Sequence, residues 1–277
     1  MRFPRAETIA AIGLFTGSLA LLLTAHPAAA LTGAALTGAA LPAAALPAEV
    51  TPLIVPGTAA PVFGADIHLP PLSQTRYHDA GRGPTRVIRE YQSSGRYAQD
   101  QQAVAAKAEA FLADWLATTC GDTSQAACRP VAVFDIDDTL LNWYPVLTAH
   151  DFTSTSAQRA AAVKDCTTPA IAPVRALLKE AKVLGADVFL LSGRSEGQRA
   201  DTEACLRKRG ITGWAKLTLR SAKQESLSAN DFKSAQRAQW ELDGWRLALN
   251  IGDQVSDLAG GHAAAGFLLP NPMYYIP

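Results

Sequence analysis

The sequence carries no excess of charge of either sign, because Lys and Arg together number 25 and Asp and Glu together also number 25. Proteins that bind nucleic-acid polymers usually present net positive charge to the phosphate backbone, so this balance argues against such a partner. Beyond residue 25, no stretch reaches the roughly 20 consecutive apolar side chains that a membrane-spanning helix needs. We therefore expect a folded body without stable membrane insertion.

The first thirty residues have the pattern of an export signal. Arg2 and Arg5 give a basic start, an apolar run follows from Ile9 to Ala25, and residues 28–30 are alanines of the kind that a signal peptidase accepts. We predict that residues 1–30 are removed and that the protein is exported to a secreted, periplasmic or cell-envelope space. An uncleaved membrane anchor is the alternative.

A second zone, residues 31–75, is rich in Ala, Leu and Pro. Prolines remove backbone donors and small side chains offer little area to bury, so this composition predicts a flexible spacer. The folded domain is predicted over residues 76–277.

Cysteine is scarce, with only four residues, at Cys120, Cys128, Cys166 and Cys205. They form no C-x-x-C pair and no cluster with histidine, which argues against a zinc site. An even number in an exported chain favours two disulfides, and three pairings are possible. We favour Cys120 with Cys128, which closes a short polar loop, and by exclusion Cys166 with Cys205. Four free, buried thiols are the alternative.

Short apolar runs alternate with helical patterns from residue 96 onward. Strands are predicted at Val131–Phe134, Val188–Leu191, Lys216–Leu219, Leu247–Ile251 and Gly266–Leu269. Helices are predicted at 96–117, 171–184 and 196–208, where apolar side chains recur at three- and four-residue spacing. This alternation predicts an α/β fold with a parallel sheet covered by helices on both faces.

Polar residues stand where three of these strands end. Asp135 and Asp137 follow the first strand, Ser192 follows the second, and Asp253 and Asp257 follow the strand Leu247–Ile251. The carboxyl ends of parallel strands form the ligand-binding edge of such sheets. Four carboxylates in one crevice repel each other and need protonation or a cation, and ligands that are all oxygen point to Mg²⁺.

These residues resemble the motifs of the haloacid dehalogenase superfamily, in the secreted acid phosphatase branch that includes class B and class C acid phosphatases and plant vegetative storage proteins. Asp135-x-Asp137-x-Thr139 is similar to the first motif, Ser192 to the second, Lys233 to the third, and Gly252-Asp253-x-x-x-Asp257 to the fourth. The segments 232–237 and 270–277 resemble the acid phosphatase branch in particular. The resemblance covers the chain from about Tyr77 and implies a Rossmann-like sheet with a small cap inserted at about 142–168.

The resemblance also implies roles for these residues. Asp135 would attack phosphorus to give an aspartyl-phosphate, and Asp137 would protonate the leaving oxygen and then take a proton from water. Ser192 and Lys233 would bind the phosphoryl oxygens. Asp135, the backbone carbonyl of Asp137, Asp253 and Asp257 would hold Mg²⁺. A general acid among several carboxylates is expected to have a raised pKa.

Three polar residues near these motifs each have two possible roles. Asp138 is expected to form a turn rather than to act in catalysis. Thr139 either caps the following helix or touches phosphate. Arg194 either binds substrate or is paired in a salt bridge.

The cap carries three aromatic residues, Trp143, Tyr144 and Phe152. They either stack on a nucleobase, which would make nucleoside monophosphates substrates, or pack the cap against the body. The expected activity is that of an exported, Mg²⁺-dependent acid phosphatase acting on small phosphomonoesters. A phosphotransferase with alcohol acceptors and a non-catalytic storage or phosphate-binding protein are the alternatives.

Overall fold

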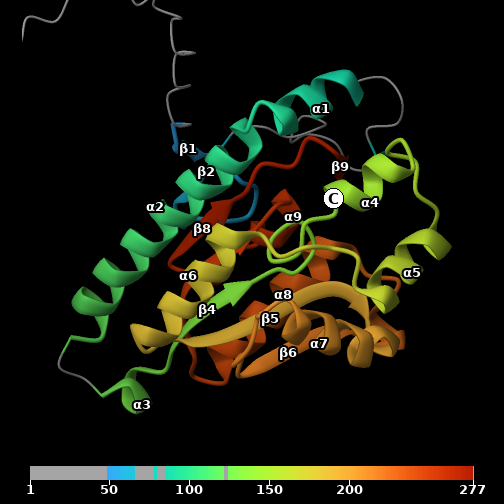
Figure 1. Cartoon of the computed structure of the whole chain (residues 1–277). Coiled ribbons are helices and arrows are strands. Elements are labelled where there is room, and N and C mark those ends of the chain that lie inside the picture. Colours follow the sequence, from blue (N-terminus) through green and yellow to red (C-terminus); the bar gives the residue numbers. More distant parts are fainter. Residues whose placement is uncertain (1–48, 66–77, 80–84, 122–123, 277) are drawn as a thin grey trace, which may run out of the picture. The chain divides into compact units, whose positions relative to one another are not determined.

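The structure is a computed structural model that describes residues 49–65, 78–79, 85–121 and 124–276 (Figure 1). The export signal expected at 1–30 and the first part of the expected spacer lie outside these residues. Within the described ranges, no helix is both long enough and apolar enough to cross a membrane.

In the described part of the chain, seven strands form the main sheet, in the order β1-β2-β8-β7-β4-β5-β6. Their bounds are β1 Thr51–Leu53, β2 Val62–Gly64, β4 Pro130–Phe134, β5 Asp187–Ser195, β6 Lys216–Arg220, β7 Arg246–Gly252 and β8 Ala265–Leu268. Every neighbouring pair is parallel except β1 with β2. Two more strands, β3 (His78–Asp79) and β9 (Tyr274–Tyr275), pair antiparallel in a small separate sheet. The predicted parallel sheet is confirmed, with an added antiparallel edge.

Helices cover both faces of this sheet (Figure 1). Their bounds are α1 Thr85–Ser93, α2 Arg96–Thr119, α3 Gln125–Cys128, α4 Tyr144–Ala149, α5 Ser156–Asp165, α6 Ala172–Val183, α7 Arg199–Lys208, α8 Ala229–Leu242 and α9 Val255–Leu258. The three predicted helices correspond to α2, α6 and α7, the last preceded by a 3₁₀ turn at Glu196–Gln198.

The central strand β4 supplies core residues to both faces, since successive side chains of a strand point in opposite directions. Ala132 and Phe134 join the apolar core that includes residues of α2 and α6. Val131 and Val133 pack instead with Trp240 of α8. The continuous apolar sequence of this strand follows from burial on both sides.

The prediction of a flexible spacer at 31–75 is wrong for part of this range, because β1 and β2 belong to the sheet. Strand β2 pairs in parallel with β8, and Phe63 stacks on Phe267 with 5.8 Å between ring centroids. Gly64 permits this pairing, since a Cβ there would lie 2.6 Å from the backbone oxygen of Leu268. Three-residue strands among prolines are too short to show a periodic pattern, which is why composition misleads here.

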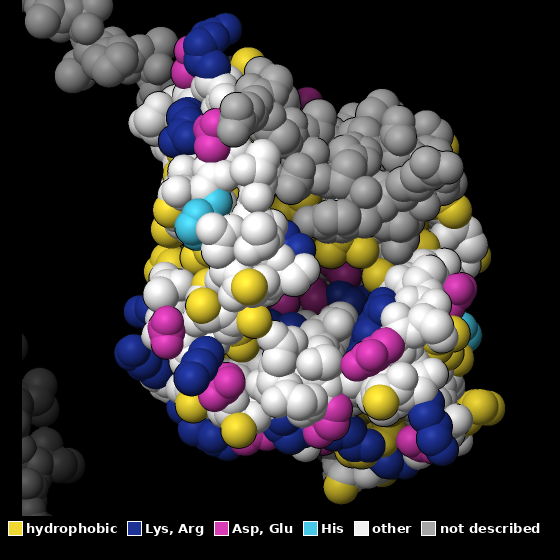
Figure 2. All heavy atoms as spheres, turned by 90° about the vertical axis from the view of Figure 1, so that its right-hand side faces the viewer, with side chains coloured by type: hydrophobic (Ala, Val, Ile, Leu, Met, Phe, Trp, Pro, Cys, Tyr) yellow, Lys and Arg dark blue, Asp and Glu magenta, His cyan; other side chains and the backbone are white. Residues whose placement is uncertain are grey.

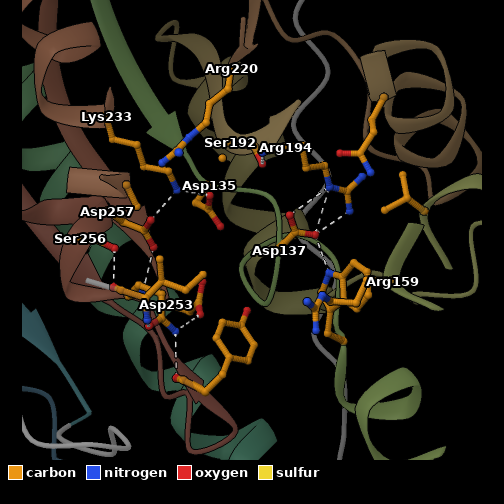
Figure 3. Close-up of a pocket in the computed structure, with 18 of the residues that line it drawn as sticks. Asp135, Asp137, Arg159, Ser192, Arg194, Arg220, Lys233, Asp253, Ser256 and Asp257 are labelled. Carbon is orange, nitrogen blue, oxygen red and sulfur yellow. Dashed lines mark hydrogen bonds and ion pairs between the residues drawn. The ribbon is translucent and has the colours of Figure 1, made fainter. Parts of the chain in front are cut away.

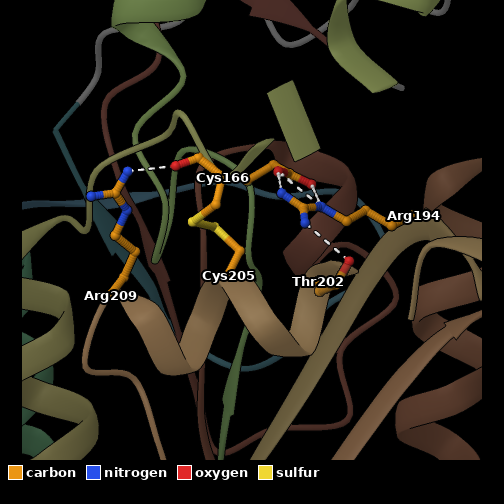
Figure 4. Close-up of a disulfide and its surroundings, with 6 residues drawn as sticks. Cys166, Arg194, Thr202, Cys205 and Arg209 are labelled. Atoms are coloured by element: carbon orange, nitrogen blue, oxygen red, sulfur yellow. Dashed lines mark hydrogen bonds and ion pairs between the residues drawn. A yellow bond between two sulfur atoms is a disulfide. The ribbon is translucent and has the colours of Figure 1, made fainter. Parts of the chain in front are cut away.

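Both favoured disulfides are confirmed: the structure pairs Cys120 with Cys128 and Cys166 with Cys205. Cys166 follows α5 directly and Cys205 lies on α7, so the second bridge joins the insertion at 142–168 to the body (Figure 4). Arg209 reinforces the same junction by donating from Nη2 to the Cys166 carbonyl oxygen at 2.6 Å.

Replacing Cys166 and Cys205 together by serine is expected to lower the free energy of unfolding by about 4 kcal/mol, because the bridge closes a loop with a sequence separation of 39. The matched control replaces Cys120 and Cys128, whose separation is 8, and should cost only about 2.5 kcal/mol. Urea denaturation of the oxidised proteins measures both. A larger loss for the control pair would contradict this ranking.

Candidate active site

The polar residues predicted at the strand ends line one cavity of about 440 Å³. Strands β7, β4 and β5 are neighbours in the parallel sheet, so their carboxyl ends meet at the same edge. Figure 2 shows a hollow whose floor carries acidic and basic side chains. All the side chains predicted for catalysis, phosphate binding or metal binding reach this cavity (Figure 3): Asp135, Asp137, Ser192, Lys233, Asp253 and Asp257.

Ser192 reaches the cavity from within a strand rather than from its end. The predicted strand stops at Leu191, whereas β5 continues to Ser195. Its pairing with β6 is irregular between Leu191 and Ser195, and this irregularity surrounds the serine. The fully buried Ser192 hydroxyl accepts a hydrogen bond from the Arg194 backbone N–H at 3.3 Å.

Three carboxylates form the most acidic part of the cavity. Asp135, Asp253 and Asp257 are 6%, 1% and 3% exposed, and one oxygen of each lies within 4.8 Å of the others. Burial raises the pKa of Asp135 and Asp253 well above their ordinary value, opposed at Asp135 by the nearby Lys233 ammonium. A set of oxygen-only ligands with unbalanced negative charge fits a hard divalent cation.

Lys233 supplies the one ammonium group that contacts this cluster among the described residues. Its Nζ lies 2.5 Å from Asp135 Oδ1 and 2.5 Å from Asp257 Oδ1. Burial opposes the charged form of Lys233, but the two carboxylates outweigh it and raise the pKa above its ordinary value. One positive charge therefore bridges the predicted nucleophile and the last predicted metal ligand. When all three carboxylates are ionised, the cluster keeps a net negative charge.

The loop after β7 is braced so that its carboxylates face the cavity. Position 252 requires glycine because the Asp257 side chain packs directly against it: a Cβ there would lie 2.3 Å from Asp257 Oδ2. Asp253 Oδ2 accepts from the amides of Gln254 and Asn271 at 2.6 Å each. The hydroxyl of Thr139 donates to Asp253 Oδ1 at 3.3 Å, a role that differs from both of its predicted ones. The C-terminal segment thus holds a predicted metal ligand in place.

Asp137 lies apart from the three-carboxylate cluster and pairs with Arg194. The guanidinium donates from Nη2 to Oδ1 at 2.6 Å and from Nε to Oδ2 at 3.0 Å, and Trp143 Nε1 adds a bond to Oδ1 at 2.5 Å. Burial alone would raise the pKa of Asp137, but these donors bring it below its ordinary value. The expectation of a raised pKa is therefore wrong for this residue, because sequence spacing did not reveal its partner.

Of the two roles considered for Arg194, the structure shows the salt bridge, which it forms with Asp137. Its remaining edge donates from Nη1 to the Thr202 hydroxyl at 3.0 Å (Figure 4). Asp138 forms the expected turn, with φ of 51° and with Oδ1 accepting from the Trp143 backbone N–H at 2.8 Å. Burial raises the pKa of Asp138 to about 7. Asp138 lies outside the cavity lining, whereas Arg194 lines the cavity beside Asp137.

The three aromatic residues of the cap occupy different places. Phe152 is 0% exposed and does not line the cavity, and Tyr144 packs edge-on against it at 6.1 Å between ring centroids. Both pack in an apolar cluster that joins the cap to the body, so of the two readings the packing one describes these two residues. Trp143 does line the cavity, but it is 6% exposed and its ring nitrogen is engaged with Asp137.

Two arginines that line the cavity were missed in the sequence, Arg159 on α5 and Arg220 at the end of β6. Figure 3 shows Arg220 reaching toward Lys233 and Ser192. Its Nε is buried without a hydrogen-bond partner among the described residues, and Nη1 donates to the Leu227 carbonyl oxygen at 2.8 Å. Isolated arginines outside any motif carry no sequence pattern that separates them from surface residues.

Comparison with known proteins agrees with this geometry. The family described as "HAD superfamily, subfamily IIIB (Acid phosphatase)" matches residues 82–277. Acid phosphatase 1 of Solanum lycopersicum is 38% identical over 152 residues, which cover 53% of this chain and 60% of that protein. The stem 28 kDa glycoprotein of Glycine max is 36% identical, covering 52% of this chain and 59% of the relative. The match thus spans about three fifths of each of these two relatives.

A solved structure supports the fold alone. The class C acid phosphatase from Bacillus anthracis superposes with a TM-score of 0.54 at 18% identity, covering 69% of this chain and 84% of that one. The family match extends over more than half of the sequence and includes every predicted site residue. The chain belongs to the subfamily IIIB acid phosphatases of the HAD superfamily.

Proposed function

We propose that this protein is an exported, Mg²⁺-dependent acid phosphatase that hydrolyses small phosphomonoesters through an aspartyl-phosphate. The observation that carries the proposal is the placement of Asp135 on the cavity floor, bonded to Lys233 and beside Asp253 and Asp257. A nucleophilic carboxylate, positive charge for phosphoryl oxygens and a separate proton carrier are the groups that phosphoryl transfer requires.

In the first half-reaction, a carboxylate oxygen of Asp135 forms a bond to phosphorus while the bond from phosphorus to the alcohol oxygen breaks. The leaving oxygen takes the electron pair of that bond and receives a proton from Asp137. Arg194 holds Asp137 charged in the free protein, so Asp137 must gain a proton before it can donate one.

In the second half-reaction, water attacks phosphorus and the bond to Asp135 breaks. Asp137 accepts the proton that water loses, which returns it to the protonated form that donated in the first half-reaction, and Asp135 leaves phosphorus as a free carboxylate. Ser192 and Lys233 bind the phosphoryl oxygens through a hydroxyl and an ammonium group. Both line the cavity together with Asp135.

Asp135, Asp253 and Asp257, with the backbone carbonyl of Asp137, would hold the cation. When bound, Mg²⁺ supplies charge neutralisation that lets an anionic nucleophile approach an anionic phosphoryl group. Burial, and after it the neighbouring carboxylates, raise the pKa of Asp135 and Asp253. A cation would favour the charged forms of both groups, which fits this assignment.

Removal of Mg²⁺ by EDTA is expected to lower phosphate release from p-nitrophenyl phosphate by at least about a hundredfold. Added Mg²⁺ at about 100 times its Kd should also raise the free energy of unfolding by about 2.7 kcal/mol, measured without substrate. Full activity in EDTA, with no effect of Mg²⁺ on unfolding, would contradict the metal assignment.

Export is supported by the two disulfides, which form and persist in oxidising compartments. We retain the predicted signal at 1–30 as part of this proposal. N-terminal sequencing of the secreted protein tests it: a chain starting near residue 31 agrees, and an intact residue 1 would contradict cleavage.

A storage role is the second candidate, because relatives include the stem glycoprotein of Glycine max and vegetative storage protein 1 of Arabidopsis thaliana, which is 30% identical over 151 residues. The two candidates differ in turnover. A folded protein that binds Mg²⁺ yet releases no phosphate from any phosphomonoester would favour storage.

A further inference from the structure

The cap helix α5 presents one face to the cavity. Ser156, Arg159, Ala160 and Val163 all line it, at the three- and four-residue spacing of a single helix face. Polar groups stand at the start of this face and apolar ones follow. Ser156 is the first residue of the helix, where the backbone dipole adds partial positive charge.

Arg159 is held in place by neutral partners only. Its Nη1 donates to the Ser154 carbonyl oxygen at 2.5 Å and to the Ser154 hydroxyl at 3.3 Å. Its Nη2 has a long contact of 3.5 Å with the Ser156 hydroxyl. In the ranges that the structure describes, no carboxylate lies within 4.0 Å of this guanidinium, in contrast to Arg194. A fixed guanidinium without a counter-charge is suited to bind an anion.

The position of Arg159 decides which part of a substrate it could meet. Figure 3 shows it on the Asp137 side of the cavity, across from Lys233 and Asp257. Asp137 protonates the leaving oxygen in the proposed reaction, so the alcohol part of the substrate lies on this side. Arg159 therefore faces the leaving group rather than the phosphoryl group.

We propose that Arg159 and the Ser156 hydroxyl form a subsite for an anionic group on the alcohol part of the substrate, so that the preferred phosphomonoesters carry a carboxylate or a second phosphate. This inference rests on the proposed phosphatase function. The burial of Phe152 and of most of Trp143 supports it, because little aromatic surface is left for stacking on a nucleobase. Charge, rather than ring stacking, then selects the leaving group.

Arg220 provides a matched comparison within the same cavity. Its Nε lies 3.9 Å from where a Cβ of Gly193 would stand, next to Ser192, and its guanidinium carbon is 5.3 Å from the centre of the Phe232 ring. It thus lies on the phosphoryl side. Replacing Arg220 should lower kcat/KM for all phosphomonoesters alike. Replacing Arg159 should lower kcat/KM selectively for those with an anionic leaving group.

The test compares 3-carboxyphenyl phosphate with 3-carbamoylphenyl phosphate, which differ in charge and little in shape. We expect wild-type kcat/KM to favour the carboxylate by about tenfold, and Arg159→Gln to remove most of that preference. Arg159→Lys should keep part of it, and Arg220→Gln should lower both rates without changing their ratio. Arg207 is an exposed arginine that pairs with Glu203 outside the cavity, so Arg207→Gln should change neither of the two rates nor their ratio.

An unchanged ratio in Arg159→Gln would overturn the subsite. An equal fall for both substrates would also overturn it, because that result marks Arg159 as a brace for the Ser154 loop only. If wild-type protein releases phosphate neither from these esters nor from any other phosphomonoester, the phosphatase proposal fails, and the preference is then read from the dissociation constants of the two esters by calorimetry. A tenfold tighter binding of the carboxylate that depends on Arg159 supports the anion subsite in either case.

Discussion

Replacing Asp135 by asparagine is expected to lower kcat on p-nitrophenyl phosphate by at least about 10⁴-fold, since an amide cannot form the bond to phosphorus. The substituted protein should remain folded. The side chain keeps its shape, the amide oxygen can still accept from Lys233, and one of three mutually repelling buried carboxylates is removed. Steady-state rates and a thermal unfolding curve measure the two effects separately.

The matched control for this change is Asp187→Asn. Asp187 begins β5 at the edge of the sheet opposite the cavity, and it is exposed. We expect its rate to stay within about twofold of wild type, because surface substitutions far from a site rarely change it. If Asp135→Asn retained a tenth of wild-type activity, Asp135 could not be the nucleophile.

Replacing Lys233 by methionine is expected to have the second largest effect. Methionine fills a similar volume without charge, so Asp135 and Asp257 lose their shared bonds to the ammonium. Breaking a buried ion pair from one side costs about 3 kcal/mol of unfolding free energy. Loss of a cation that stabilises phosphoryl oxygens should also lower kcat/KM by about 10² to 10³.

Two measurements separate these effects of Lys233. Added Mg²⁺ should stabilise Lys233→Met more than it stabilises wild type, since the variant leaves more negative charge unpaired around the cation site. Lys223→Met, at an exposed lysine outside the cavity, should change neither stability nor rate appreciably. An activity of Lys233→Met within threefold of wild type would contradict the assigned role.

The strands and the chemistry at their ends were predictable because they depend on local patterns. An apolar run such as 131–134 must be buried on both faces, and the carboxylates that follow it must then lie at the sheet edge. Lys233 could be placed through the resemblance of its neighbouring residues, although its helix α8 was not predicted.

Other features depend on contacts between distant residues, which a sequence pattern does not reveal. The lowered pKa of Asp137 requires Arg194, 57 residues away. Phe152 and the pocket-lining Arg159 belong to the same insertion, and only the packing of the cap decides which side chain reaches the cavity. The strands β1 and β2 are likewise defined by pairing with β8 rather than by their own composition.

The most direct test of the central claim is the partition of the phosphoryl group between water and methanol for several aryl and alkyl phosphates. A common aspartyl-phosphate on Asp135 predicts the same ratio of phosphate to methyl phosphate for every substrate, because the leaving group has departed before the acceptor attacks. If methyl phosphate were the main product at a low methanol concentration, the protein would be a phosphotransferase that uses the same intermediate. A ratio that changes with the leaving group would contradict the covalent mechanism.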